Sequence, residues 1–289
     1  MVDSISDKSK NYHKKASTNI SITLLLSFLF NIIVICGGLY TNSVAILSDS
    51  IHEVADTLCI FISWVLEKAS LKNPDDKYTY GYQRLSLLSA LITSFFVIGA
   101  SIFVLYESFT RIFYIVKPDA KGMFIFGIIG IIFKGYSFYK VYNGQTYNEK
   151  AISLHLLGDL LEWVAILILS IILMFSDLVI LDPIISLIIA IWLIYSLGKT
   201  SIESIRIFLQ KVPDQYNLKE IKEKILKIDN VCEIINIHLW SLDGIALILT
   251  CKLKVKTTNK DDLIQIRNDI SKISKEYDVI EETVEFIFN

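Results

Sequence analysis

The sequence predicts an α-helical membrane protein with six transmembrane helices followed by a small cytoplasmic α+β domain. Of its 289 residues 53% are hydrophobic, and the mean hydropathy is +0.51, values typical of a polytopic membrane protein rather than a soluble globule. Six apolar segments are long enough to cross a bilayer. After Lys211 charged residues become frequent, and a Val-Pro pair marks a boundary. We therefore expect an N-terminal cytoplasmic tail at 1–18, a transmembrane domain at 19–211 and a tail domain at 212–289.

The six apolar segments are the first elements to justify. A hydrocarbon core of about 30 Å needs roughly 20 residues of helix, and each segment has at least this length. We place them at 19–40, 43–67, 85–114, 122–142, 149–175 and 178–205.

Basic residues near the segment ends predict the orientation. With the N-terminus in the cytoplasm, eleven lysines and arginines fall on the cytoplasmic side and three on the other side. Both termini are therefore expected in the cytoplasm. The first 18 residues are polar and carry four lysines, which predicts no secretory signal peptide. The formal net charge of −2 argues against nucleic acid as a partner.

The tail domain has the pattern of a small α+β unit. Helical apolar spacing and runs of β-branched residues predict the order αββαβ, with Asp243 and Gly244 as the turn between the first two strands. The expected helices are 218–228 and 260–277, and the expected strands are 231–239, 245–255 and 279–288.

Two motifs of identical spacing lie inside apolar segments: His52 and Asp56 in LSDSIHEVADTL, and His155 and Asp159 in ISLHLLGDLLEW. A spacing of four places both side chains on one helix face, about one turn apart. Polar groups that bind metals are costly in lipid and mark a functional site. Two such helices side by side would offer two nitrogens and two oxygens, the ligand set of a tetrahedral zinc site.

The topology brings the two motifs to one level. The second segment runs inward and the fifth runs outward, so His52 should lie level with Asp159, and Asp56 with His155. We therefore expect one four-ligand site for a divalent transition metal near mid-membrane. Zn²⁺ suits these donors, and Co²⁺, Cd²⁺, Fe²⁺ or Mn²⁺ could also be accepted. The alternative, a helix-packing hydrogen bond within each pair, explains one such motif better than two.

Four further polar residues extend this region. Asp49 shares the face of the first motif, where it either guides ions or caps the helix start. Asn31 either lines the ion path or forms an interhelical hydrogen bond. Glu162 shares the face of the second motif, and its depth differs from that of Lys134 by about 6 Å. We expect a Glu162–Lys134 ion pair that neutralises both charges, and the alternative is that Glu162 carries protons.

Two rival functions must be weighed against transport. The order His52-Glu53-x-x-Asp56 resembles the HExxH pattern of zinc proteases, in which Glu is the general base. Asp replaces the second His, and a second metal-type pair exceeds what this hydrolase chemistry needs. A metal sensor that signals without flux is the other rival, and a tail poor in metal ligands argues against it. The sequence therefore favours a transporter and not an enzyme.

Five segments resemble the cation diffusion facilitator family, in its zinc-type subgroup. The paired HxxxD motifs are the most specific part of the resemblance, which extends over about residues 19–288. The segments are GGLYTNSVAILSDSIHEVAD, YTYGYQRLSLLSA, LYESFTRI, NEKAISLHLLGD and NIHLWSL.

The resemblance implies a homodimeric exporter that moves zinc out of the cytoplasm in exchange for protons. Zinc is then the transported substrate, and no cofactor is needed. The family's transport ligands map onto His52, Asp56, His155 and Asp159, and a His/Asp pair on both helices implies zinc over manganese. The tail is similar to the family's ferredoxin-like domain, which dimerises and often binds regulatory zinc. The compact length favours a location in the cell membrane, plasma or inner.

The chain also departs from this family. Its tail has a single histidine, His238, and the loop before the fifth segment has none. We expect His238 to be a packing residue, with a weak tail metal site as the alternative. Glu162 and Trp163 replace the small residues usual after Asp159. Nearly all metal chemistry should therefore depend on the two HxxxD motifs.

Overall fold

The computed structural model describes residues 2–41, 44–113, 120–176 and 180–288, apart from some side chains near helix ends. These residues form two compact units, which are described separately. The first unit comprises Tyr12–Glu203, and the second comprises Ser204–Asn289 with Met1–Asn11.

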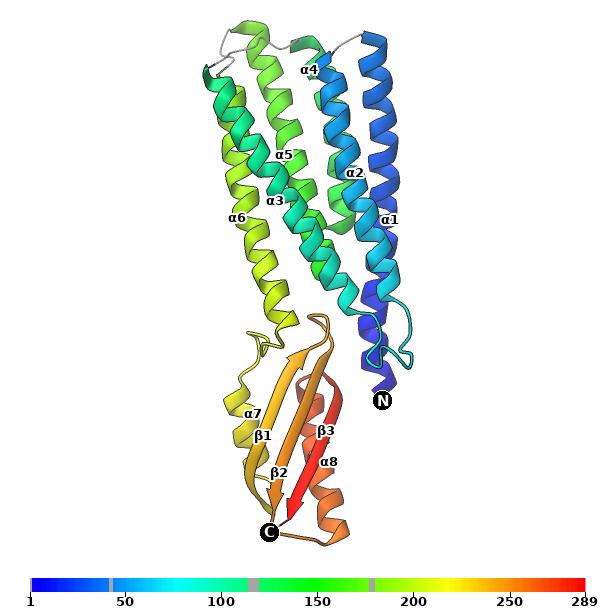
Figure 1. The fold of residues 1–289 in the computed structure, drawn as a ribbon, viewed down its shortest axis with the longest axis vertical. Coiled ribbons are helices and arrows are strands. Elements are labelled where there is room, and N and C mark those ends of the chain that lie inside the picture. The colour runs from blue at the N-terminus through cyan, green and yellow to red at the C-terminus, as the bar shows by residue number, and fades with distance from the viewer. Residues whose placement is uncertain (1, 42–43, 114–119, 177–179, 289) are drawn as a thin grey trace. The chain divides into compact units, whose positions relative to one another are not determined.

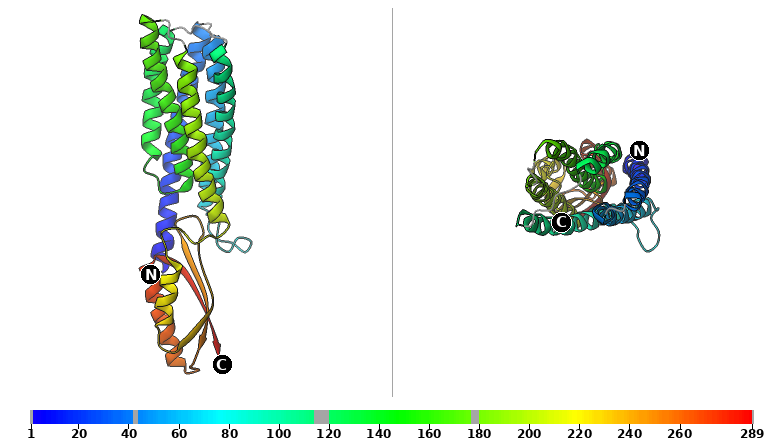
Figure 2. Two further views of the ribbon diagram at one scale, coloured as in Figure 1. Left: turned by 90° about the vertical axis from the view of Figure 1, so that its left-hand side faces the viewer. Right: turned by 90° about the horizontal axis from the view of Figure 1, so that it is seen from above.

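Six long helices make up most of the chain, and in the first unit they lie alongside one another (Figures 1 and 2). Each predicted segment coincides with one helix to within a few residues, except that α1 begins long before residue 19. The helices are α1 Val2–Thr41, α2 Val44–Ser70, α3 Arg84–Phe113, α4 Ala120–Val141, α5 Tyr147–Phe175 and α6 Leu181–Phe208.

Five of these helices are long and apolar enough to cross a membrane, judged over the described residues. The stretches are Ser9–Gly37, Arg84–Phe113, Gly122–Val141, Tyr147–Phe175 and Leu181–Phe208. Within the same described part of the chain α2 is not in this set, because it carries Glu53, Asp56 and Glu67 along its length. A helical membrane domain is thus established, while the sixth span stays a prediction.

The start of α5 is held in place by side chains. Glu149 donates its backbone N–H to Thr146 Oγ1 at 3.1 Å, and Thr146 donates its N–H to Glu149 Oε2 at 3.4 Å, which forms a capping box. Asn19 on α1 donates to the other carboxylate oxygen at 2.9 Å. This cap fixes the register of α5 about two turns before His155.

Trp163 on α5 packs into a space provided by a glycine. The ring lies edge-on to Phe30 of α1, with ring centroids 5.4 Å apart, and both side chains are buried together with Val34. A Cβ added at Gly130 of α4 would come within 2.3 Å of the indole ring. Gly130 therefore permits the close approach of the large Trp163 side chain.

Gly130→Ala is expected to destabilise the protein by about 1–3 kcal/mol, because the indole ring or the α4 backbone must shift to relieve the overlap. Thermal unfolding of the purified protein in detergent checks this. Gly99→Ala is the matched control, since a Cβ there meets nothing within 4 Å. Equal melting temperatures for the two variants would show that Trp163 does not need the glycine.

The tail forms a three-stranded sheet with two helices on one face (Figure 2). Strand β1 pairs antiparallel with β2, and β2 pairs parallel with β3, so that β2 is central. The parallel pair is joined through a helix, as such connections require. The predicted order αββαβ is confirmed. The elements are α7 Leu218–Leu226, β1 Val231–Ser241, β2 Leu247–Val255, α8 Lys260–Glu276 and β3 Val279–Phe288.

Alternation along β2 builds the tail's core. Leu249, Cys251, Leu253 and Val255 are buried and point to the helix-covered face, where Ile270 of α8 is fully buried. Burial and the nearby Glu282 carboxylate raise the pKa of the Cys251 thiol to about 11. Cys251 is therefore a core residue rather than a reactive thiol or a metal ligand.

Candidate metal site between the helices

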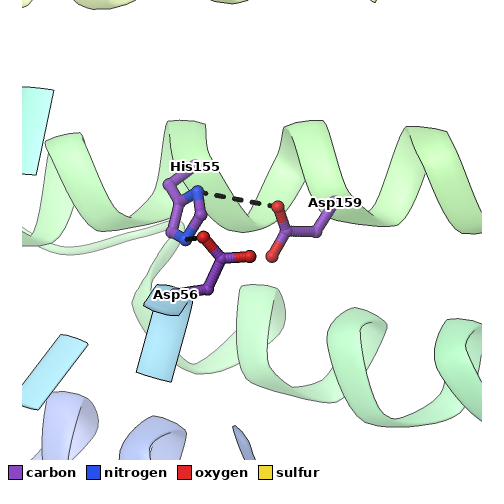
Figure 3. Close-up of side chains that lie close together, drawn as sticks. All are labelled: Asp56, His155 and Asp159. Atoms are coloured by element: carbon purple, nitrogen blue, oxygen red, sulfur yellow. Dashed lines mark ion pairs between the residues drawn. The ribbon is translucent and has the colours of Figure 1, made fainter. Parts of the chain in front are cut away.

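Asp56, His155 and Asp159 converge on one point between α2 and α5. Each offers one ligand atom, and these three atoms all lie within 4.8 Å of one another. The imidazole of His155 faces both carboxylates, one on its own helix and one across from it (Figure 3). His155 Nε2 lies 3.6 Å from Asp56 Oδ1, and Nδ1 lies 3.6 Å from Asp159 Oδ1. The four-residue spacing places His155 and Asp159 on one face of α5, and the packing of α2 against α5 brings Asp56 to them.

The distance from His155 Nε2 to Asp56 Oδ1 fits two ligands of one metal ion better than a hydrogen bond. A separation of 3.6 Å is too long for a good hydrogen bond. Bonds of about 2.0 Å from tetrahedral zinc to nitrogen or oxygen place neighbouring ligand atoms about 3.3 Å apart. His155 Nε2 is buried and makes no hydrogen bond with any described residue. A buried polar atom without a partner is costly, and a cation at this point would satisfy it.

His52, the fourth expected ligand, lies beside this group rather than within it. Its Nε2 is 3.7 Å from Asp56 Oδ2, and 51% of its side chain is exposed. Over the described residues it does not join the cluster of atoms within 4.8 Å. A four-ligand site that includes His52 thus stays a prediction.

The predicted Glu162–Lys134 ion pair is wrong. Lys134 is only 1% exposed, and its Nζ lies 2.7 Å from Asp159 Oδ2 and 2.7 Å from Glu53 Oε2. Among the described side chains, no ion pair joins it to Glu162. Depth along the helices allowed Glu162 as a partner, but these two acidic groups are close enough to contact Lys134 directly. Glu53 lies one position after His52 and therefore off the helix face that His52 shares with Asp56. The four-residue spacing of the motif did not identify it as a partner of Lys134.

The other residues singled out in the sequence have different surroundings. Asn31 is buried and donates to Thr57 Oγ1 at 2.8 Å, which is the interhelical hydrogen bond weighed as its alternative role. The side chain of Asp49 lies outside the described residues. His238 is exposed on β1, and no group of three potential ligands among the described residues includes it.

A cavity of about 40 Å³, enough for a few water molecules, adjoins the cluster formed by Asp56, His155 and Asp159. It is bordered by α2, α3, α5 and α6, and its lining includes Asp56, Asp159, His52 and Glu162. From Asp159 to Glu162 on α5, and from Asp56 to His52 on α2, the lining follows both helices in one direction. Because the two helices are antiparallel, this direction leads to the end where α2 begins and α5 finishes.

The opposite end of α2 is occupied by a buried polar network. Glu67 is fully buried, and its Oε2 accepts from Ser86 Oγ at 2.7 Å and from Asn148 Nδ2 at 2.8 Å. His13 Nδ1 lies 2.7 Å from Glu67 Oε1. Ser89 Oγ in turn donates to Asn148 Oδ1 at 2.8 Å. Side chains from α1, α2, α3 and α5 are thus joined there. Sequence reasoning missed this network, although polar residues within apolar segments were its visible signal.

Together, the fold and the site define an integral membrane protein with side chains that could hold a metal ion between its helices. Comparison with known proteins identifies the family to which the chain belongs. Residues 20–209 match the family described as "Cation efflux transmembrane domain". The chain belongs to this cation efflux family, the cation diffusion facilitators, and is therefore a metal cation transporter and not an enzyme. The resemblance seen in the sequence is confirmed.

Several relatives cover most of this chain. It is 26% identical over 270 residues to the metal cation efflux system protein CzcD of Cupriavidus metallidurans, which covers 93% of this chain and 85% of that protein. It is 28% identical over 239 residues to the zinc transporter ZitB of Pectobacterium atrosepticum, covering 80% and 74%. It is 27% identical over 236 residues to the cadmium, cobalt and zinc/H(+)-K(+) antiporter of Bacillus subtilis, covering 79% and 76%.

Proposed function

We propose that this protein exports Zn²⁺ from the cytoplasm in exchange for protons, and that Asp56, His155 and Asp159 bind the ion during transport. The observation that carries this proposal is the convergence of one imidazole and two carboxylates, all within 4.8 Å, between helices of a membrane domain. His52, 3.7 Å from Asp56, completes a set of two nitrogens and two oxygens. Such a set suits tetrahedral zinc.

The choice of metal rests on the donors and on the relatives. Mixed nitrogen and oxygen ligands favour Zn²⁺, and similar geometry admits Co²⁺ and Cd²⁺. The names of the similar proteins mention zinc, cadmium and cobalt. Zinc is the substrate we propose first, and the other two are secondary substrates.

The proposed mechanism is alternating access coupled to proton exchange. Zinc binds only neutral imidazole and deprotonated carboxylate, so protons that reach the site release the ion. The cavity on one side of the cluster and the Glu67 network on the other support a state that faces one side of the membrane. Return to the other side requires that this network opens. An ion drives such a change only through its different affinity for the two states.

The remaining assignments rest on the sequence and on the family. We place both termini in the cytoplasm, because basic residues are concentrated at that end of the predicted helices. The cavity then faces outward in this conformation. We further propose six spans, a location in the cell membrane, and a homodimer formed through a ferredoxin-like tail.

Transport by purified protein in liposomes tests this function. With Zn²⁺ outside and a zinc-sensitive dye inside, an acidic lumen is expected to speed zinc entry, because protons leave as zinc enters. The same assay with Co²⁺, Cd²⁺, Fe²⁺ and Mn²⁺ gives the selectivity. Zinc binding without zinc entry would support a sensor instead. A rate of zinc entry that is the same with and without the pH gradient would exclude proton coupling.

A further inference from the structure

Lys134 is a buried lysine in direct contact with one of the proposed metal ligands. Lys134 comes from α4, which contributes no proposed ligand, and its ammonium group is almost wholly buried. It lies 2.7 Å from Asp159 Oδ2, 2.7 Å from Glu53 Oε2, and 5.7 Å from the centre of the Phe30 ring. A buried lysine on two carboxylates and an aromatic face is held in one place.

The two oxygens of Asp159 have different neighbours. Oδ2 accepts the hydrogen bond from Lys134, whereas Oδ1 faces His155 Nδ1 at 3.6 Å. Oδ1 thus lies beside the imidazole ring of the proposed metal site, whereas Oδ2 is engaged by the ammonium group of Lys134. A cation that also took Oδ2 would have to share this oxygen with the Lys134 ammonium group, so the arrangement favours coordination through Oδ1 alone.

Glu53 makes this arrangement possible without a net charge on the supporting pair. Its carboxylate is 6% exposed and balances Lys134, so that Lys134 adds no uncompensated positive charge beside the metal. Asp56 and Asp159 then offer two negative charges, which match a divalent ion. Buried charges are tolerated only when they are paired in this way.

We propose that Lys134, supported by Glu53, is a positioning residue that keeps Asp159 monodentate and so favours four-coordinate ions over ions that need more oxygens. Zn²⁺ accepts four ligands, whereas Mn²⁺ prefers octahedral oxygen coordination and gains from a bidentate carboxylate. Partners of this kind typically change metal affinity 10- to 100-fold when lost. This inference rests on the proposed function and names the element of the site that sets its selectivity.

The double variant Lys134→Met with Glu53→Gln tests this inference, because it removes both charges together and leaves neither one buried alone. Zn²⁺ and Mn²⁺ affinities are measured by isothermal titration of the purified protein. We expect the ratio of zinc to manganese affinity to fall by about 10- to 100-fold. If Lys134 and Glu53 had a purely structural role, the double variant would lose affinity for Zn²⁺ and Mn²⁺ to the same extent. Lys134→Arg keeps the positive charge and should keep the wild-type ratio, and Lys140→Met on the same helix is the matched control.

Two outcomes separate this inference from the proposed function. If the wild type binds and transports zinc but the double variant keeps the wild-type affinity ratio, Lys134 does not set selectivity. If the wild type neither binds nor transports zinc, the proposed function itself fails. Should the double variant not fold, Co²⁺ loaded into the wild type still decides the point, since a visible spectrum of six-coordinate rather than tetrahedral cobalt would overturn a monodentate Asp159.

Discussion

Asp56→Ala is expected to abolish zinc transport. Asp56 is the residue that faces both histidines: its Oδ1 lies 3.6 Å from His155 Nε2, and its Oδ2 lies 3.7 Å from His52 Nε2. Among the described residues, Asp56 is the one carboxylate of α2 in the cluster with His155 and Asp159, and the substitution removes it. Because losing even a residue that merely supports a ligand costs about 10- to 100-fold in affinity, we expect transport to fall more than about 100-fold.

Zinc flux into liposomes and zinc affinity by titration measure this effect together. Asp56→Asn keeps the shape and one carbonyl oxygen, and should retain the fold while binding zinc weakly. Asp182→Ala is the matched control, because Asp182 also lies in a spanning helix but only approaches Arg111 at 3.9 Å. Wild-type flux from Asp56→Ala would exclude this residue from the site.

Glu67→Ala should produce the largest loss of stability in the helical unit. Three side chains from three other helices, namely His13, Ser86 and Asn148, meet its carboxylate, which is fully buried. Alanine would remove the carboxylate that all three side chains contact and would open a cavity, and Asn148 would keep its longer bond to the backbone oxygen of Ser63 at 3.3 Å. Removing one partner from a buried charged network costs about 3–5 kcal/mol, so we expect a loss of that order.

Thermal unfolding in detergent, followed by size-exclusion chromatography of the heated protein, measures this loss. Glu67→Gln keeps one acceptor and should cost less. Glu203→Ala is the control for removing a carboxylate at the surface, where its ion pair with Lys150 is partly exposed and worth about 0–1 kcal/mol. A melting temperature for Glu67→Ala equal to that of Glu203→Ala would mean that the network does not hold the helices together.

Apolar length and repeated spacing allowed much of this protein to be predicted. The long helices follow from runs of apolar residues that only a membrane accommodates, and the tail's αββαβ order follows from its periodicity. The HxxxD motifs indicated Asp56, His155 and Asp159 as candidate ligands, because residues four apart share a helix face whatever the helix packs against. These features depend on local sequence, so one sequence was enough to find them.

Contacts between helices were predicted less well. Asp159 and Glu53 pair with Lys134, although helix depth alone allowed Glu162. The distance of His52 from the three-residue cluster was likewise not visible in its spacing.

By itself the sequence determined the helices, the αββαβ tail and which residues could bind a metal. Only the tertiary structure decided which of them meet, because this depends on how each helix is rotated and how closely it approaches its neighbours. Side-chain packing sets both, as at Gly130, where the absence of a Cβ lets Trp163 come close. Within one helix the period of 3.6 residues decides which side chains share a face, but no such period relates α4 to α2 and α5.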